Sequence, residues 1–365
     1  MKVPFLDLRI IDENERRELL GAIAEVFDHG RFILGPEVAR LEQRIARLTH
    51  TRHAVGVNSG TDALILSLRA LGIGPGDEVI TTPLSFIATA NAIALNGAHP
   101  VFADILDDMT LDPQSIEPLI TDKTRALLPV HWAGRVCRME EILPIARKHN
   151  LVVVEDCSQA FGAHRHGQPA GSFGACGCFS MNTMKCLASI GEAGMVVTDR
   201  EDWREKLEAL RYNGLINREK CHYVSHNGRL DTIQAAVIDK RLNGYEHLLA
   251  QRRDHARYYL ETLQSVATIP KEDAGCRDIY YTFTLQVEHR DALKEWLEQR
   301  GIECRIQHFP LMPDQPAYRD NTRNNTRRAH ELIRRMLCIP ASEKVTVEQR
   351  EYVAAQILKF YNSGS

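Results

Sequence analysis

Short, mainly apolar runs alternate with helical segments along the first 200 residues of the chain, and no other feature limits the possible folds as strongly. Each run spans only four or five residues. Strands that are short, apolar and separated by helices are typical of a mostly parallel sheet covered on both faces. The ligands of such sheets bind at the carboxyl ends of the strands. The runs are 53–57, 78–82, 100–103, 126–130, 151–155 and 195–198.

The sequence changes character after residue 227. A polar helical stretch runs from Asp231 to about Leu263, with a break near Asn243 and Gly244. Because 365 residues exceed the usual limit of one hydrophobic core, we expect two domains. We predict an α/β protein with a large α/β/α domain around a mostly parallel central sheet and a small C-terminal α+β domain. The predicted domains are residues 1–245 and 246–365, and the small domain is expected to be built from 279–287, a helix over 291–300, and 303–308.

Charge and cysteine content exclude several classes of function. A net charge of −3 gives no reason to expect a nucleic acid or a membrane as partner. The N-terminus carries Lys2, Asp7 and Arg9 and resembles no signal peptide. Of the nine cysteines, Cys176 and Cys178 are the only close pair, and no second pair completes a zinc site. We therefore expect a cytoplasmic protein with reduced thiols, no metal site and a small-molecule substrate.

A polar segment follows the first apolar run, where a helix is expected to begin. It contains Ser59, Gly60 and Thr61. A helix that starts with glycine offers free backbone N–H groups to an anion, and the helix dipole also favours negative charge. The segment therefore suggests a phosphate site, although an ordinary helix cap explains the same residues.

An acidic residue, Asp156, stands at the carboxyl end of an apolar strand. A carboxylate in this place could keep a heterocyclic nitrogen protonated, as cofactors that act as electron sinks require. It could also bind a metal ion or a ribose hydroxyl, or simply cap a helix. No GxGxxG motif follows the first strand, which argues against a dinucleotide site.

A single lysine, Lys185, lies among small and apolar residues. Most lysines in a mixed stretch are simply solvated. A partly buried lysine, however, can act as a nucleophile toward an aldehyde. Ser180, five positions upstream, could donate a hydrogen bond to a phosphate. The polar loop 225–230, which leads into a helix at Asp231, indicates little by itself.

Together, these segments resemble the DegT/DnrJ/EryC1/StrS family of sugar aminotransferases, which are fold-type I pyridoxal-phosphate enzymes of the aspartate aminotransferase superfamily. The resemblance covers nearly the whole chain, and its segments follow one order. They are 35–38, 59–64, 83–91, 129–131, 155–156, 159–160, Lys185, and Asp231 with 233–236.

The resemblance implies a transaminase that depends on pyridoxal 5'-phosphate. Lys185 would form the internal aldimine with the cofactor and later move the proton, and Asp156 would pair with the pyridinium nitrogen. These two are the implied catalytic residues. The other implied cofactor contacts are Gln159 on the phenolic oxygen, Phe86 stacked on the ring, and Gly60, Thr61, Ser180 and Asn227 at the phosphate.

The resemblance also implies partners. Asn227 matches a residue that reaches the phosphate from a neighbouring subunit, so a homodimer with shared active sites is expected. The amino group would pass from glutamate to a keto-sugar, most often a nucleotide-linked 3- or 4-keto-deoxyhexose, in the biosynthesis of deoxyamino sugars for polysaccharides or antibiotics. The candidate substrate contacts are Arg229, Tyr281, His308 and Tyr318.

Two segments depart from the family pattern. The lysine is preceded by Asn-Thr-Met rather than His-Pro-Thr, and 191–194 reads Gly-Glu-Ala-Gly rather than Gly-Asp-Gly-Gly. Neither change removes a group with an implied role, but both leave the substrate subgroup open. The alternatives are a non-catalytic regulatory or binding member of the same fold, a keto-sugar not linked to a nucleotide, a fold-type I desulfurase or decarboxylase, and a nucleotide-dependent oxidoreductase.

Overall fold

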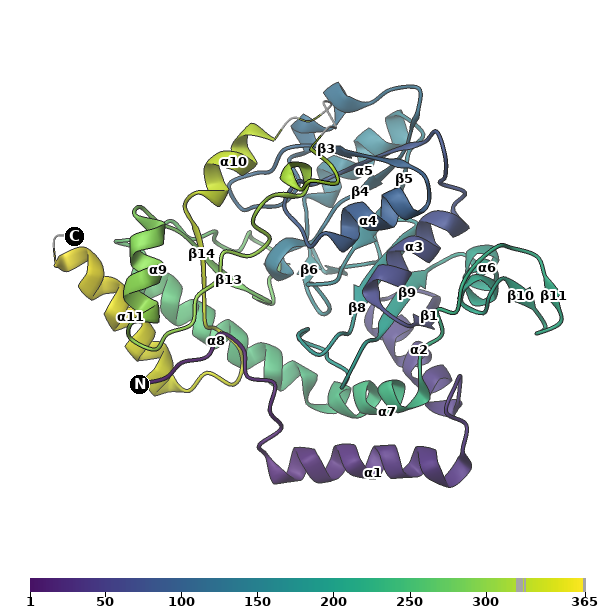
Figure 1. Ribbon diagram of the computed structural model, residues 1–365, viewed down its shortest axis with the longest axis horizontal. Coiled ribbons are helices and arrows are strands. Elements are labelled where there is room, and N and C mark those ends of the chain that lie inside the picture. Colours follow the sequence, from purple (N-terminus) through teal and green to yellow (C-terminus); the bar gives the residue numbers. More distant parts are fainter. Residues whose placement is uncertain (320–323, 325, 364–365) are drawn as a thin grey trace.

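A seven-stranded sheet forms the centre of the computed structural model, which describes residues 1–319, 324 and 326–363. The sheet is parallel except for β9, which runs antiparallel to both of its neighbours. The predicted mostly parallel sheet is thus confirmed, and β8 is a strand that the apolar runs did not predict. In spatial order the strands are β1 (His53–Val57), β9 (Gly194–Thr198), β8 (Cys176–Ser180), β5 (Val152–Asp156), β4 (Thr124–Leu128), β2 (Glu78–Thr81) and β3 (His99–Phe102) (Figure 1).

Helices cover both faces of this sheet. Successive side chains of a strand point to opposite faces, so Val154 joins one apolar cluster and Val153 the other. Both faces are buried, which explains why the strands read as continuous apolar runs. One cluster includes residues of α3 (Gly60–Ala70), α4 (Ala88–Leu95) and α6 (Glu201–Arg211), and the other includes residues of α2 (Pro36–Leu48), α5 (Met139–Lys148) and α7 (Thr232–Arg241).

The predicted break in the long polar helix is confirmed. A short 3-10 turn, Leu242–Gly244, separates α7 from α8 (Tyr245–Leu263). The first helix of the chain, α1 (Glu13–His29), packs against α7. It begins at Asp12, whose carboxylate accepts the N–H of Glu15 at 2.7 Å.

The C-terminal part has its own apolar cluster, built on α8, α9 (Arg290–Glu298), α11 (Val347–Asn362) and a two-stranded sheet of β13 (Phe283–Gln286) and β14 (Met336–Ile339). The segment 303–308, expected as part of the small domain, forms no regular strand. Arg305 forms only an isolated bridge with Cys338, and the backbone turns at His308, where φ is 57°. The remaining elements are α10 (Arg327–Ile333) and the short strands β6 (His164–Arg165), β7 (Gln168–Pro169), β10 (Leu215–Ile216), β11 (Lys220–Cys221) and β12 (Cys276–Arg277).

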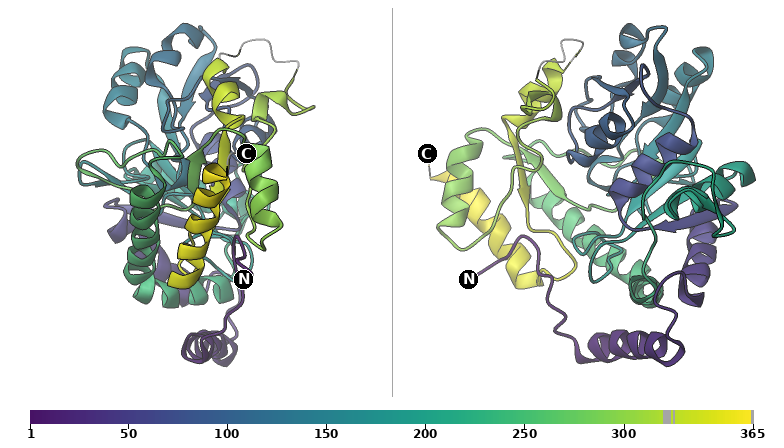
Figure 2. Two further views of the ribbon diagram at one scale, coloured as in Figure 1. Left: turned by 90° about the vertical axis from the view of Figure 1, so that its left-hand side faces the viewer. Right: turned by 45° about the vertical axis from the view of Figure 1, so that its right-hand side comes forward.

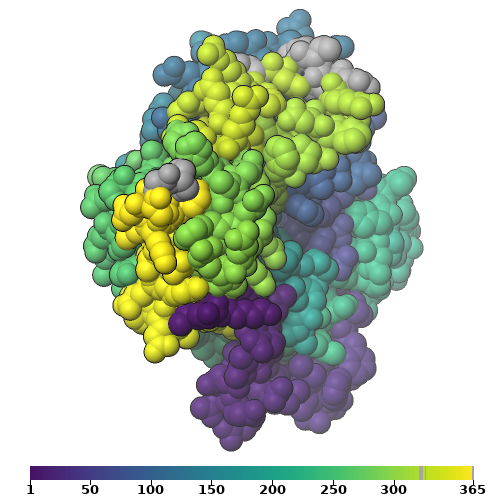
Figure 3. All heavy atoms as spheres, turned by 60° about the vertical axis from the view of Figure 1, so that its left-hand side comes forward, coloured from purple at the N-terminus to yellow at the C-terminus, as the bar shows by residue number. Residues whose placement is uncertain are grey.

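The start of the chain lies against this C-terminal part. Val3 belongs to its apolar cluster, and the N–H of Val3 donates to the carbonyl of Gly301 at 2.8 Å. The space-filling view shows this purple segment crossing the green and yellow region (Figure 3), and α1 lies beyond it (Figure 2). A domain division near residue 245 stays a prediction. Among the described helices, none has the length and apolar character needed to cross a membrane.

Candidate active site

Asp156 lies at the carboxyl end of β5, as expected, with only 3% of its surface exposed. Its carboxylate has two fixed partners. Oδ1 accepts the backbone N–H of Ser158 at 3.1 Å, and Oδ2 accepts the hydroxyl of Thr89 at 2.8 Å. A buried carboxylate needs such donors, since burial without them is costly. The side chain is therefore held in one orientation at the end of the sheet.

Gln159 is held beside this strand end by a backbone group. Its Oε1 accepts the N–H of Ala133 at 2.8 Å. Because the oxygen end of the amide is engaged in this way, the Nε2 end is the part of the side chain left to donate to a ligand. Ala133 makes this contact from the left-handed region, with φ 54°.

A buried pair, Glu155 and His131, supports the loop that carries Ala133. Glu155 Oε2 lies 2.8 Å from His131 Nε2, and His131 Nδ1 accepts the N–H of Cys137 at 3.2 Å. The Sγ atom of Cys157 lies close to both side chains, and the three ligand-type atoms fall within 4.8 Å of one another. The Glu155 oxygens are already engaged, because they also accept three backbone N–H groups, from Gly171, Phe173 and Gly174.

The predicted phosphate segment lies against the end of β8. A Cβ added at Gly60 would come within 2.5 Å of Ser180 Cβ, so only glycine allows α3 to approach Ser180 so closely. Ser59 caps α3 by accepting the N–H of Asp62 at 3.0 Å. Gly60, Thr61 and Ser180 are thereby brought together, with backbone N–H groups and hydroxyls as donors for an anion.

Lys185 lies in the turn between β8 and β9 and is partly buried. Its Nζ is 4.8 Å from the centroid of the Tyr281 ring, a cation–π contact. Gly134 packs against the backbones of both Tyr281 and Gln159. A Cβ at this position would lie 3.1 Å from the Tyr281 backbone nitrogen and 3.2 Å from the Gln159 carbonyl oxygen. Tyr281, which Lys185 contacts, thus packs against the same glycine as the Gln159 backbone.

His308 lies near Lys185 and packs against two aromatic rings. Its ring centroid lies 6.0 Å from that of Phe86 and 5.1 Å from that of Trp132. Burial and the nearby Lys185 charge lower the pKa of His308 to about 4, so the ring is neutral near pH 7. Phe86 itself is 58% exposed, which leaves its face open to a ligand.

Asn227 and Arg229 lie beside the start of α3 in the same protomer. The Nε of Arg229 donates to Asn227 Oδ1 at 2.8 Å, and its guanidinium lies 4.5 Å from the Tyr212 ring centroid. Asn227 is exposed. Its side chain is therefore held at the surface rather than among the buried site residues.

Tyr318 makes its contacts with α4 and β3. Its hydroxyl donates to Asn91 Oδ1 on α4 at 2.6 Å, and its ring packs on Phe102.

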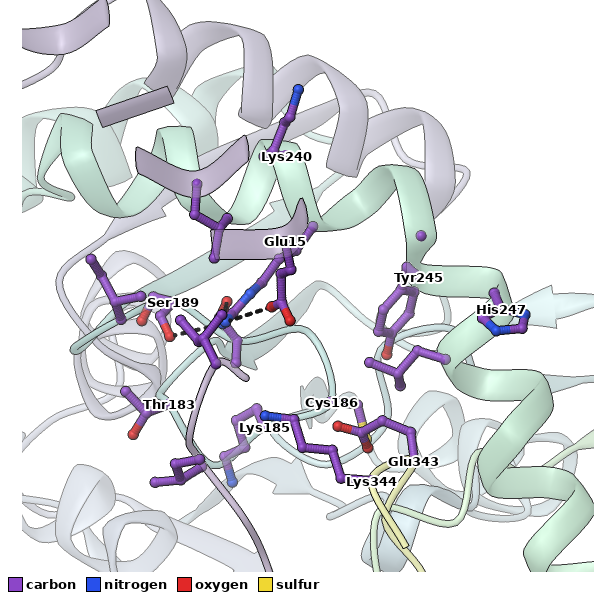
Figure 4. A pocket seen from close by; sticks show the side chains of 18 of the residues that line it. Glu15, Thr183, Lys185, Cys186, Ser189, Lys240, Tyr245, His247, Glu343 and Lys344 are labelled. Carbon is purple, nitrogen blue, oxygen red and sulfur yellow. Dashed lines mark hydrogen bonds and ion pairs between the residues drawn. The ribbon is translucent and has the colours of Figure 1, made fainter. Parts of the chain in front are cut away.

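A cavity of about 640 Å³ also touches Lys185. It is lined by the 183–190 turn, α1, the 6–10 segment, the end of α7, α8 and Glu343 (Figure 4). Neither Asp156 nor Gln159 lines this cavity.

The donor set fits the cofactor that the sequence resemblance implies. Asp156 offers an anionic acceptor, which suits a protonated ring nitrogen, and Gln159 Nε2 offers a donor for a phenolic oxygen. Gly60, Thr61 and Ser180 offer donors for a phosphate, in a contact that a Cβ at Gly60 would fill. These residues would hold pyridoxal phosphate.

The sequence interpretation missed residues that hold the site together. Ser85, Thr89 and His131 lie in segments that carry the family resemblance, but only Phe86 among the residues of those two segments was given a role. Ser85 and Thr89 are four positions apart at a helix start, and this spacing puts hydroxyls on one face. The spacing was readable, but the partner Asp156 is 67 residues away and came only from the fold.

Comparisons with known proteins agree with this geometry. A model described as the DegT/DnrJ/EryC1/StrS aminotransferase family matches residues 13–358. The chain is 38% identical over 361 residues to the UDP-N-acetyl-3-dehydro-alpha-D-glucosamine 3-aminotransferase of Acidithiobacillus ferrooxidans, with 97% of each chain covered. It is 36% identical over 370 residues to a pleiotropic regulatory protein of Geobacillus stearothermophilus, with 99% of each covered.

A solved structure is similar over the whole fold. The crystal structure of NtdA from Bacillus subtilis with bound cofactor PMP superposes with a TM-score of 0.93 at 28% identity. The match covers 99% of this chain and 85% of that chain. The predicted fold class is thereby confirmed.

Proposed function

Because the chain belongs to the DegT/DnrJ/EryC1/StrS aminotransferase family, whose sugar aminotransferases depend on pyridoxal phosphate, we propose that it moves an amino group from glutamate to a nucleotide-linked keto-sugar. The relative from Acidithiobacillus ferrooxidans, named for a UDP-linked 3-dehydro sugar, supports this substrate class. We also propose a cytoplasmic homodimer with shared active sites. A 3- or 4-keto-deoxyhexose is the proposed acceptor.

One observation carries the proposal. Lys185 Nζ lies over Tyr281 on one side of the site, and the Asp156 carboxylate is fixed at the end of β5. An amine and a buried, donor-supported carboxylate are the two groups that transamination requires of the protein. Bound pyridoxal phosphate supplies an electrophilic carbon and a heterocycle that accepts electrons.

The protein's own residues have separate tasks in this proposal. Lys185 holds the cofactor and then takes and returns the proton at the substrate carbon, a type of catalysis that contributes about 10² to 10⁴-fold. Asp156 keeps negative charge against the ring nitrogen. Gln159 Nε2 orients the ring by donating a hydrogen bond, and Gly60, Thr61 and Ser180 bind the phosphate.

Phe86 is proposed to stack on the cofactor ring, and the proposed substrate contacts lie beside it. His308, whose ring lies against Phe86 and Trp132, is neutral near pH 7, so it accepts or donates a hydrogen bond without repelling Lys185. Tyr281 provides an apolar face that excludes water from the reacting atoms. Arg229, which is half-buried beside the exposed Asn227, is proposed to meet the anionic nucleotide across the subunit boundary.

The experiment that tests this function follows nitrogen from donor to acceptor. Purified protein is mixed with pyridoxal phosphate, ¹⁵N-glutamate and UDP-linked 3-keto sugars, and the products are measured by mass spectrometry. We expect a labelled amino sugar, and we expect Lys185→Ala to lower turnover by about 10² to 10⁴-fold or more. Lys148→Ala is the matched control, because Lys148 is 66% exposed and pairs with the surface residue Glu117.

A regulatory role is the second candidate, and one observation favours it. The relative from Geobacillus stearothermophilus is named as a regulatory protein and matches along 99% of its length. The same assay separates the two functions. A protein that binds the cofactor but transfers no nitrogen to any keto-sugar, whether nucleotide-linked or free, would contradict the proposed activity and favour regulation.

A further inference from the structure

Two buried hydroxyl groups connect the Asp156 carboxylate to the segment that carries Phe86. Thr89 Oγ1 lies 2.8 Å from Asp156 Oδ2, and Ser85 Oγ lies 2.9 Å from Thr89 Oγ1. The exposed fractions are 4% for Ser85 and 1% for Thr89. The two residues flank Phe86 on either side, and the N–H of Thr89 donates to the Phe86 carbonyl at 3.1 Å.

The chemistry of the groups fixes the direction of these hydrogen bonds. A hydroxyl has one proton to donate, and an ionised carboxylate has none. Thr89 therefore donates to Asp156, and Ser85 donates to Thr89. Since the other carboxylate oxygen accepts the N–H of Ser158 at 3.1 Å, Asp156 cannot rotate without losing a bond. The chain of hydroxyls ends on the negative charge and stabilises it.

We propose that Thr89, supported by Ser85, is a positioning residue that fixes the Asp156 carboxylate relative to Phe86. The inference rests on the proposed function, in which Asp156 and Phe86 contact the same pyridine ring. Thr89 acts through Asp156 rather than on the substrate. It links a side chain at the end of β5 to a side chain in front of α4, two elements that do not adjoin in sequence.

Thr89→Val removes the hydroxyl and keeps the shape of the side chain. We expect the Kd for pyridoxal phosphate, measured by absorbance titration of the apoprotein, to rise about tenfold, the loss typical of a hydrogen bond to a charged group. Without the donor, the Asp156 carboxylate is less firmly held against the ring nitrogen of the bound cofactor. The pH midpoint of the visible absorbance band of the bound cofactor should therefore move away from the wild-type value.

Two further variants test the hydrogen bonds that run from Ser85 through Thr89 to Asp156. Thr89→Ser keeps the hydroxyl and should restore most of the wild-type Kd and midpoint. Ser85→Ala removes a neutral donor one step further away and should raise the Kd by about threefold.

The matched control is Thr198→Val. Thr198 is 2% exposed, and its hydroxyl donates to the Ala175 carbonyl at 2.9 Å, at the opposite end of the strands from Asp156. Like Thr89→Val, this variant loses one buried threonine hydroxyl, so any general destabilisation should affect both variants. Circular dichroism and thermal unfolding measure the folding of each variant. Thr198→Val should keep the wild-type Kd and midpoint.

The outcomes separate this inference from the proposed function. A wild-type protein that binds no pyridoxal phosphate would contradict the function itself. If the wild type binds but Thr89→Val has the same Kd and midpoint, or loses no more affinity than Thr198→Val, the positioning role is wrong. Should Thr89→Val fail to fold, Ser85→Ala decides, and an unchanged Kd and midpoint in that variant would overturn the role.

Discussion

At the scale of single residues, backbone N–H groups hold the charges of the site. Glu155 accepts N–H groups from Gly171, Phe173 and Gly174, at 2.7 to 2.9 Å. Asp156 and Gln159 each accept one more. Backbone donors cannot move without moving a strand or loop, so the acceptors they bind keep their positions. This arrangement is the preorganisation that an electrostatic site requires.

The neutral state of His308 gives a pH-dependent stability. Its pKa is about 4 in the folded protein and 6.5 in an unconstrained side chain, so the unfolded chain binds more protons between these values. Stability should therefore fall as the pH drops from 6.5 toward 4. In His308→Asn, the loss of melting temperature between pH 7 and pH 5 should be smaller than in the wild type.

The exposed residue His222 provides the control for this measurement. His222→Asn should lose the same melting temperature on acidification as the wild type. Parallel melting curves for the wild type and His308→Asn would show that His308 does not carry the effect.

At the scale of elements, the close approach of α3 to β8 brings together the residues of the proposed phosphate site. The cap at Ser59 fixes where α3 begins, and Gly60 lets it touch Ser180. A second glycine, Gly194 on the neighbouring β9, leaves no room for a Cβ against the Ser59 carbonyl. The start of α3 therefore packs closely against β8 and β9 because Gly60 and Gly194 have no side chains.

Gly60→Ala tests this contact. The added Cβ, 2.5 Å from Ser180 Cβ, must push α3 away from β8. We expect the Kd for pyridoxal phosphate to rise by about tenfold, the cost of weakening one hydrogen bond to a charged group. Fluorescence titration of the apoprotein measures it.

The control is a glycine of an open helix position. Gly21 lies in α1, where a Cβ would meet nothing within 4 Å. Gly21→Ala should leave the Kd unchanged and raise stability by about 0.5 to 1 kcal/mol, the usual gain of alanine over glycine in a helix. If Gly60→Ala and Gly21→Ala had equal Kd values, the close contact between α3 and β8 would not control the affinity for pyridoxal phosphate.

At the scale of the whole molecule, large apolar side chains are exposed in the segments that carry the site residues. Phe86, Met184 and Ile190 are 58%, 44% and 41% exposed. Apolar side chains that cluster at a functional surface mark an interaction site. Together with the exposed Asn227, they support the proposed homodimer in which each subunit completes the other's site.

Subunit complementation tests the shared site. Lys185→Ala removes the amine, and Asn227→Asp sets a carboxylate against the phosphate of the partner's site. Each variant alone should be nearly inactive. After random pairing, half of the dimers are mixed and one of their two sites is intact, so co-expression should restore about one quarter of wild-type activity in a two-fold symmetric dimer. A mixture as inactive as its parents would contradict sharing.

The sequence by itself determined the sheet class and predicted the residues with chemical roles. Hydrophobic periodicity is local, and buried parallel strands need apolar residues on both faces, so runs such as 151–155 were readable. The break near Asn243 was readable for the same reason. Lys185, Asp156 and Gln159 were assigned from ordered motifs, which record side-chain type but not side-chain contact.

Only the tertiary structure decided which groups hold those residues. The bonds from Thr89 to Asp156 and from Ala133 to Gln159 span 67 and 26 positions. The pairing of β13 with β14 and the single bridge from Arg305 to Cys338 likewise join segments far apart in the chain. Such contacts depend on how strands pair and helices dock, which is a property of the packed chain and not of any local pattern.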